Sequence, residues 1–388
     1  MIPYGRQHIN NKDIEAVVSV LKSQYLTQGE KVPEFERLLS AYCGVERGVA
    51  VNSATSALHI ACRSLGLDSG DYLWTTTNTF VASGNCALYC GASVDLVDID
   101  NDTYNMSVPA LEKKLKVAKT EGRLPKIVIP VHFAGQSCDM RAIKKLSEEY
   151  GFYIIEDASH AVGAEYLDRK VGSCDYSDIT VFSFHPVKII TTGEGGMCMT
   201  NNLDLAEKMD LLRNHGINRD RTKMINKDDG PWSFEQIDLG LNYRLTDIGA
   251  ALGISQMDRL DLFIEKRLEI AKRYDDELGN LPLKLHEQSV DSKSSYHLYV
   301  VRIDVEGLNV ELSKIYNALR EEGVGVSKHY IPMFRHPYYK DMGFNPEDFP
   351  NTMSYYRESI SLPIYPTFSS AEQAFVIDKL NKVLDRFS

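Results

Sequence analysis

Two side chains suited to acid–base and carbonyl chemistry follow apolar runs of the sequence. Asp157 closes the run FYIIED (152–157), and Lys188 comes four residues after the run DITVFSF (178–184). Ligands of open α/β sheets bind beyond the carboxyl ends of the strands, so both residues are candidates. Taken alone, Asp157 is better explained as the N-cap of a following helix. Lys188 is either a lysine whose stem packs while its ammonium reaches water, or a buried amine of lowered pKa.

The segment NSATSA (52–57) adds a place for an anion, because it leads from a predicted strand into a predicted helix. N–H groups at a helix start bind anions, although capping by Ser53 or Thr55 explains the same residues equally well. Ser183, near Lys188, offers another hydroxyl. A carboxylate, a lysine and anion donors are what pyridoxal phosphate needs for its ring nitrogen, aldehyde and phosphate. The combination favours this cofactor far more strongly than any part of it.

Motifs for other cofactors are missing from the sequence. Gly193, Gly195 and Gly196 do not complete G-x-G-x-x-G, and they precede a predicted strand rather than open a helix. The chain also lacks G-x-x-x-x-G-K-[ST], so neither a nicotinamide nor a P-loop site is expected. Its seven cysteines show no zinc spacing. We therefore expect no metal, and cysteines that are buried and reduced.

Seven segments, spread over nearly the whole chain, carry a resemblance to a known family. They are YLTQGEKVPEFE (25–36), VNSATSALHIA (51–61), TFVASGNCALYCGA (79–92), EDASHAVGAEY (156–166), SFHPVKIITTGEGG (183–196), LNYRLTDIGAALGISQ (241–256) and KHYIPMFRHPYY (328–339). These segments resemble the DegT/DnrJ/EryC1/StrS sugar aminotransferases, which belong to the fold-type I group of pyridoxal-phosphate enzymes. Ile189 and Gly193 depart from the proline and alanine common in the family, at positions that should not alter the chemistry.

The resemblance implies a role for each residue of the cofactor site. Lys188 matches the lysine that bonds to the cofactor aldehyde, and Asp157 the carboxylate that faces the pyridine nitrogen. Asn242 matches a phosphate contact that comes from the neighbouring subunit, which implies a homodimer with shared active sites. Phe80 matches the residue stacked on the ring, and His160 the one beside its hydroxyl. The expected cofactor-binding residues are Ala54, Thr55, Phe80, Asp157, His160, Ser183, Lys188 and Asn242.

The resemblance also implies substrate contacts near the N-terminus and near residue 328. Lys328 and His329 would suit a diphosphate. Plainer explanations stay open, because Tyr4 could pack against the N-terminal segment and Lys328 could be a solvated charge at a strand end. The expected substrate-binding residues are Tyr4, Gln24, Tyr25, Leu26, Thr27, Ala54, Ser183, Asn242, Ser327, Lys328, His329 and Tyr330.

The activity implied by the resemblance is transfer of an amino group from L-glutamate to a UDP-4-keto-6-deoxy sugar. IPYGRQ, NSATSALHIAC, SFHPVKIITTGEGG and GPWSFEQIDLGLNYRLTD are similar to members that aminate C4 of UDP-2-acetamido-2,6-dideoxy-4-keto-L-arabino-hexose in pseudaminic acid synthesis. The closest alternative is an aminotransferase for another 4-keto or 3-keto nucleotide sugar, of bacillosamine or perosamine type. A sugar 3-dehydratase carries histidine in place of Lys188, and a non-catalytic binding protein would not need the amine.

Alternating strands and helices must position these residues over the first 250 positions. The expected strands are 48–53, 72–80, 93–100, 126–133, 152–157, 178–184 and 196–200. Helical patterns cover 54–66 and 139–151, and an apolar helix joins the second and third strands. This alternation implies an α/β fold with a mostly parallel sheet and helices on both faces. The resemblance implies the fold-type I aminotransferase architecture.

The pattern changes from about residue 253. A long charged helical stretch (254–279) precedes strand patterns at 295–304 and 323–332, and further helical patterns cover 312–323 and 371–387. We therefore expect two domains. A large cofactor-binding domain would cover 1–252, with segment 1–30 contributing to the substrate site, and a smaller C-terminal α+β domain would cover 253–388.

Charge and composition disfavour some classes of binding partner. The chain has 388 residues and a formal net charge of −11, which disfavours nucleic acid and anionic membranes. The longest uncharged stretch (72–94) is rich in threonine and asparagine, so it predicts a strand and a helix in a soluble core rather than a membrane span. The first residues lack the pattern of a signal peptide, and we expect a cytoplasmic enzyme.

Overall fold

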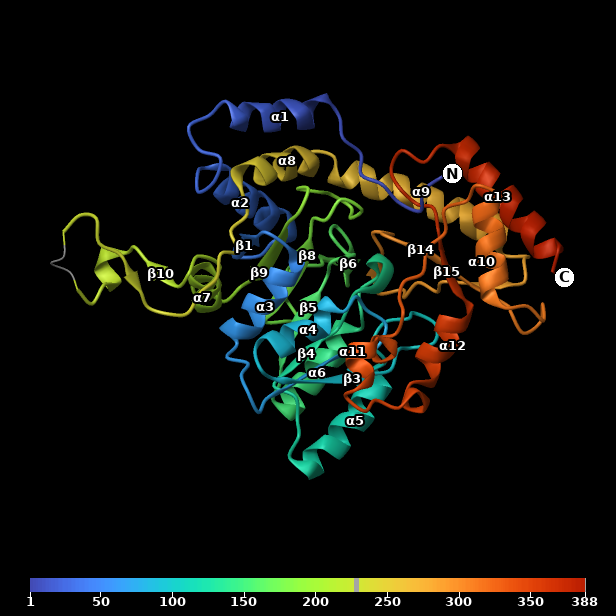
Figure 1. Ribbon diagram of the computed structural model, residues 1–388, viewed down its shortest axis with the longest axis horizontal. Coiled ribbons are helices and arrows are strands. Elements are labelled where there is room, and N and C mark those ends of the chain that lie inside the picture. Colours follow the sequence, from blue (N-terminus) through green and yellow to red (C-terminus); the bar gives the residue numbers. More distant parts are fainter. Residues whose placement is uncertain (227–229, 388) are drawn as a thin grey trace.

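The computed structural model describes residues 1–226 and 230–387 of the chain. Strand β9 is antiparallel to both of its neighbours in the central sheet, and the other neighbouring pairs are parallel, so the sheet is mostly parallel, as predicted. The seven strands lie in the order β1 (Arg47–Val51), β9 (Gly196–Thr200), β8 (Ile179–Ser183), β5 (Tyr153–Asp157), β4 (Ile127–Ile129), β2 (Tyr72–Thr76) and β3 (Ser93–Val97) (Figure 1).

Helices cover both faces of this sheet because successive side chains of a strand point to opposite faces. Val49 and Val51 of β1 pack on one face, and Ala50 between them packs on the other. The first face is covered by α3 (Ala54–Ser64), α4 (Ala82–Tyr89) and α7 (Leu203–Arg213). The second face is covered by α2 (Lys31–Cys43), α5 (Val108–Glu121), α6 (Met140–Tyr150) and α8 (Asp247–Met257).

A second core lies in the C-terminal part of the chain. The long helix predicted over 254–279 is two helices, because α8 ends at Met257 and α9 (Leu260–Leu278) follows after a short break. The predicted boundary at residue 252 falls inside α8, and residues 227–229 and 388 of the two predicted domains lie outside the described ranges. The core is built from a three-stranded sheet, β12 (Leu283–Leu285), β14 (Tyr299–Ile303) and β15 (Ser359–Leu362), with α10 (Leu312–Glu321) and α13 (Ser370–Asp385).

The strand predicted over residues 323–332 is wrong. Only single bridges occur in this described segment, from Val324 to Ile2 and from Ser327 to Ser361. Strand β14 already has β12 and β15 on its two edges, so the segment meets only the outer edge of β15. It then turns toward the large sheet, where the Tyr330 N–H donates to Asn78 Oδ1 at 3.0 Å.

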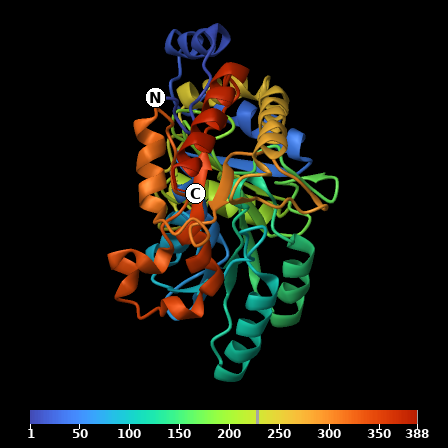
Figure 2. The same ribbon diagram turned by 90° about the vertical axis from the view of Figure 1, so that its right-hand side faces the viewer.

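Several elements lie outside the two cores. The N-terminal helix α1 (Asn11–Leu21) packs across α8 at the outer edge of the molecule (Figures 1 and 2). All seven cysteines are buried and free, as expected. In the described part of the chain, no helix is both long enough and apolar enough to cross a membrane. The remaining short elements are β6 (Glu165–Tyr166), β7 (Arg169–Lys170), β13 (Ser292–Lys293), α11 (Pro337–Lys340), α12 (Pro350–Glu358), and β10 (Ile217–Asn218) with β11 (Glu235–Gln236), which form a projecting hairpin (Figure 1).

Candidate active site

Asp157 is the last residue of β5, at the carboxyl edge of the central sheet, and its side chain is buried. Its Oδ2 accepts a hydrogen bond of 2.7 Å from the Ser83 hydroxyl, and its Oδ1 accepts one of 3.1 Å from the Ser159 N–H. Residues 158–164 form turns, so Asp157 is not the helix cap that its position alone suggests. An ionised carboxylate with two such donors can still accept a further hydrogen bond.

Lys188 lies in the loop between β8 and β9 and lines the same cavity as Asp157. Burial lowers the pKa of its amine to about 8, although the negative charge of Asp157 partly opposes this shift. Lys188 is partly exposed toward the cavity, and the lowered pKa favours the second of its two interpretations, an amine of lowered pKa. Such an amine can take up and release a proton near neutral pH.

The first turn of α3 forms the third part of the site. Ser53 caps the helix, accepting a hydrogen bond of 3.1 Å from the Ser56 N–H, so the capping explanation also holds. The N–H groups of Ala54 and Thr55 are among those that a helix start leaves without intrahelical partners, and they suit an anion. Gly196 of β9 permits the close approach of this turn, because a Cβ there would lie 2.6 Å from the Ala54 nitrogen.

One cavity of about 410 Å³ brings these parts together. Its volume is within the usual range for small-molecule sites. The predicted site residues that line it are Tyr4, Ala54, Thr55, Phe80, Asp157, His160, Ser183, Lys188, His329 and Tyr330. Five further polar residues in its wall were not predicted from the sequence: Thr79, Ser159, His185, Glu194 and His297. His297 could have been predicted to line the site, because it is a polar residue at the start of the apolar strand pattern SYHLYVVRID.

One part of the cavity wall, here called the deeper wall, consists of His160, His297, His329 and Tyr330. His160 lies 2.9 Å from the Tyr330 hydroxyl through Nε2, and its ring centre is 4.4 Å from that of His297. Burial, with the nearby positive charge of Lys188, lowers the pKa of His160 well below its ordinary value. Burial likewise lowers the pKa of His329 to about 3. These imidazoles are therefore neutral hydrogen-bonding groups near pH 7.

Some predicted site residues lie away from this cavity. The loop Gln24–Thr27 is exposed, and so is Asn242. Ser327 forms its bridge with Ser361. The Lys328 ammonium donates to main-chain carbonyls of Tyr356 and Ser359, and burial lowers its pKa to about 7. The structure therefore does not bring Lys328 together with His329 at the cavity.

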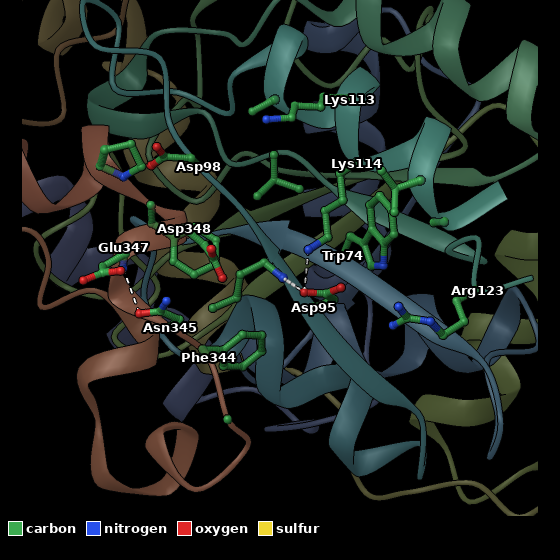
Figure 3. Close-up of a pocket in the computed structure, with 18 of the residues that line it drawn as sticks. Trp74, Asp95, Asp98, Lys113, Lys114, Arg123, Phe344, Asn345, Glu347 and Asp348 are labelled. Carbon is green, nitrogen blue, oxygen red and sulfur yellow. Dashed lines mark hydrogen bonds and ion pairs between the residues drawn. The ribbon is translucent and has the colours of Figure 1, made fainter. Parts of the chain in front are cut away.

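A larger cavity, of about 650 Å³, lies at the β3 edge of the sheet between α5 and residues 343–350. It contains none of the predicted site residues. Figure 3 shows Lys114 beside both Asp95 and Trp74; its Nζ is 2.7 Å from Asp95 Oδ1 and 5.2 Å from the centre of the indole ring. Because none of the predicted site residues lies here, the smaller cavity is the better candidate site.

The residues around the smaller cavity fit pyridoxal phosphate. Asp157 offers a carboxylate for the ring nitrogen, and Lys188 offers an amine of lowered pKa for the aldehyde. The start of α3 and the Ser183 hydroxyl, which lie at the same edge of the sheet, offer donors for the phosphate. Phe80 is 59% exposed at the cavity, so its ring is available to stack on a ligand.

Comparison with known proteins identifies relatives over nearly the whole chain. A model of the DegT/DnrJ/EryC1/StrS aminotransferase family matches residues 7–381. The chain is 38% identical over 390 residues to the UDP-4-amino-4,6-dideoxy-N-acetyl-beta-L-altrosamine transaminase of Campylobacter jejuni (serotype O:23/36), covering 100% of this chain and 98% of the relative.

Solved structures give the same result. Helicobacter pylori PseC, an aminotransferase involved in the biosynthesis of pseudoaminic acid, matches with a TM-score of 0.91 and 30% identity over 99% of both chains. Spr1654 from Streptococcus pneumoniae, in its PLP-form, matches with a TM-score of 0.89 and 28% identity over 100% of this chain and 99% of that one. The chain belongs to the DegT/DnrJ/EryC1/StrS aminotransferase family and is a sugar aminotransferase whose cofactor is pyridoxal phosphate.

Proposed function

We propose that the chain transfers the amino group of L-glutamate to C4 of UDP-2-acetamido-2,6-dideoxy-4-keto-L-arabino-hexose in the cytoplasm. The product would be UDP-4-amino-4,6-dideoxy-N-acetyl-β-L-altrosamine, an intermediate of pseudaminic acid synthesis. The observation that carries the chemistry is one cavity lined by Lys188, Asp157 and the start of α3. The choice of sugar is supported by the similarity to the Campylobacter transaminase.

Lys188 and Asp157 are the catalytic residues of this proposal. Pyridoxal phosphate, when bound, supplies an electron sink for the carbon that loses a proton. With a pKa of about 8, Lys188 is neutral in roughly a tenth of molecules at pH 7 and can act as a base at the amine-bearing carbon. Asp157 keeps the ring nitrogen protonated through a charge-assisted hydrogen bond worth about 1.5–3 kcal/mol.

The other cavity residues bind rather than react. Ala54, Thr55 and Ser183 donate to the phosphate, and Phe80 stacks on the ring. His160 lies beside the ring hydroxyl, where its neutral imidazole adds no charge. Each of these roles is supported by the place of the residue in the cavity wall.

The sugar is bound by neutral groups. Tyr4, His329 and Tyr330 line the cavity, with the Tyr4 ring centre 5.3 Å from that of His329. Phenol and imidazole groups suit the hydroxyl and acetamido groups of a 4-keto sugar. Gln24–Thr27 and Ser327–Lys328 are proposed to contact the nucleotide part of the substrate, outside this cavity.

A homodimer completes the site in this proposal. The arm, defined as residues 214–226 and 230–242, projects from the body of the molecule (Figure 1). Ile225, Trp232 and Leu239 on it are 84%, 77% and 70% exposed, which is typical of a surface that contacts another protein. A second copy is the proposed partner, because Asn242, at the base of the arm, is exposed and would reach the partner's cofactor phosphate.

Subunit mixing tests the shared site. Lys188→Ala and Asn242→Ala homodimers should each be impaired, and each mixed dimer should hold one intact site. When equal amounts of the two variants pair at random, half of the dimers are mixed, and half of the sites in those dimers are intact. About a quarter of wild-type activity should then return. No recovery in dimers shown to have exchanged subunits would assign Asn242 to its own chain.

The substrate is tested with purified enzyme, L-glutamate and each of the two C5-epimeric UDP-4-keto sugars, with the product identified by NMR. Turnover of the L-arabino epimer is expected. Equal or better turnover of the D-xylo epimer would transfer the assignment to a bacillosamine-type aminotransferase. Lys188→Ala is the control, and it should be colourless and inactive with both epimers.

A further inference from the structure

A short chain of buried hydroxyl groups ends on Asp157. Thr79 follows the end of β2, Ser83 lies in the first turn of α4, and both side chains are buried. Ser83 Oγ is 2.8 Å from Thr79 Oγ1 and 2.7 Å from Asp157 Oδ2. An ionised carboxylate only accepts hydrogen bonds, so Ser83 donates to Asp157. The Ser83 hydrogen is then used, and Thr79 must donate to Ser83.

The same contact sets the electrostatic surroundings of Asp157. Because Ser83 is the second residue of α4, its hydrogen bond places the carboxylate at the N-terminal end of that helix. The positive end of a helix dipole favours a negative charge there. The Ser159 N–H supplies the other donor, at 3.1 Å. The buried carboxylate is therefore held in place by fixed neutral donors.

We propose that Ser83 is a positioning residue that holds the Asp157 carboxylate aimed at the ring nitrogen of bound pyridoxal phosphate. Thr79 fixes the Ser83 hydroxyl, and the next residue is Phe80, the proposed stacking residue. One segment, 79–83, thus ties the carboxylate to the aromatic ring of the site. This inference rests on the proposed role of Asp157.

Cofactor binding by the apoenzyme tests the inference without relying on turnover. Ser83→Ala should weaken pyridoxal phosphate about tenfold, because one hydrogen bond to a charged group is lost. It should also shift the pH dependence of the bound cofactor's absorbance. Ser83→Thr should restore most of the affinity, since the hydroxyl is kept. Ser64→Ala is the matched control; that buried hydroxyl donates at 2.8 Å to Ala61 O within its own helix, and its loss should leave both readouts unchanged.

The outcomes separate the inference from the proposed function. If Asp157→Asn loses cofactor affinity while Ser83→Ala keeps the wild-type dissociation constant and pH profile, the inference is wrong and the role of Asp157 stands. If Asp157→Asn itself binds the cofactor as the wild type does, the proposed role of Asp157 fails and the inference fails with it. If Ser83→Ala does not fold, cofactor binding can be measured with Thr79→Val instead. That variant preserves volume, frees Ser83 from its donor, and should weaken binding about threefold.

Discussion

The Tyr330 hydroxyl lies 2.9 Å from Nε2 of His160. This contact joins the segment that follows α10 to the turn that follows β5. The Ala134 N–H donates to the other ring nitrogen of His160, Nδ1, at 3.3 Å. In a neutral imidazole this leaves the ring hydrogen on Nε2, so His160 donates to the Tyr330 oxygen. The Tyr330 hydroxyl then keeps its own hydrogen, which we expect it to donate to a ligand in the cavity that it lines.

Replacing Tyr330 by phenylalanine should therefore weaken sugar binding more than catalysis. We expect the KM for the nucleotide sugar to rise about tenfold and kcat to change less than about threefold, because the buried ring is retained and one donor is lost. Steady-state kinetics measure both constants. Tyr338→Phe, at an exposed tyrosine outside the cavity, is the control. An unchanged KM would mean that the Tyr330 hydroxyl does not contact the sugar.

Gly196 controls how closely β9 approaches the start of α3. A Cβ there would lie 2.6 Å from the Ala54 nitrogen and 2.6 Å from the Ser53 carbonyl carbon, so Gly196→Ala must push the helix start away. Cofactor affinity should fall at least about tenfold and the Tm should drop, because the proposed phosphate donors move. Gly5→Ala is the control, since its added Cβ meets nothing within 4 Å. Unchanged affinity would remove the α3 start from the phosphate site.

The carboxyl edge of the sheet could be predicted because it follows from local patterns and one topological rule. Asp157 and Ser183 end neighbouring parallel strands, and α3 starts just after β1, so strand alternation alone brings them to one edge. The lowered pKa of Lys188 was only one of two interpretations, since burial of a loop lysine depends on what packs over it.

The deeper wall could not be predicted, because it is set by contacts between remote residues. Tyr330 is held through its N–H by Asn78, more than 250 positions away, in a segment whose alternation resembles a strand. His297 takes its place beside His160 in the same way. Lys328 donates to main-chain carbonyls, which no local pattern reveals. Asn242 and Gln24–Thr27 are exposed in the single chain, so their proposed roles depend on a second subunit and on the substrate.

His132 and Glu156 form a buried pair next to Asp157 at the end of β5, with His132 Nε2 2.5 Å from Glu156 Oε2. Burial alone would lower the pKa of His132, but hydrogen bonds with Cys138 and Glu156 raise it. Burial alone would raise the pKa of Glu156, but the bond with His132 lowers it. The pair should therefore stabilise the fold fully between the ordinary values of 4.5 and 6.5 and lose effect at both acid and alkaline pH.

Glu156→Gln should lower the free energy of unfolding by up to about 3–5 kcal/mol near pH 6, because it breaks the buried pair of His132 and Glu156. Urea denaturation across the pH range measures this loss. The double variant His132→Gln/Glu156→Gln should lose less than Glu156→Gln alone, since no charge is left unpaired. Additive losses would show that the two side chains are not coupled.

Lys188 should lower the free energy of unfolding of the apoenzyme by an amount that depends on pH. Its amine has a pKa of about 8 in the folded chain, against an ordinary 10.5. Between these values the unfolded chain binds more protons, so stability rises as the pH increases from 8 to 10.5. Below pH 8 the full cost is present.

Lys188→Met should therefore stabilise the apoenzyme by up to about 3 kcal/mol at pH 7, and this gain should shrink toward zero near pH 10.5. Urea denaturation of cofactor-free protein at several pH values measures the difference. Lys12→Met, at an exposed lysine of α1, provides the baseline for replacing a lysine by methionine. A gain that persists unchanged at high pH would come from packing of the methionine and would contradict a buried, charged Lys188 in the apoenzyme.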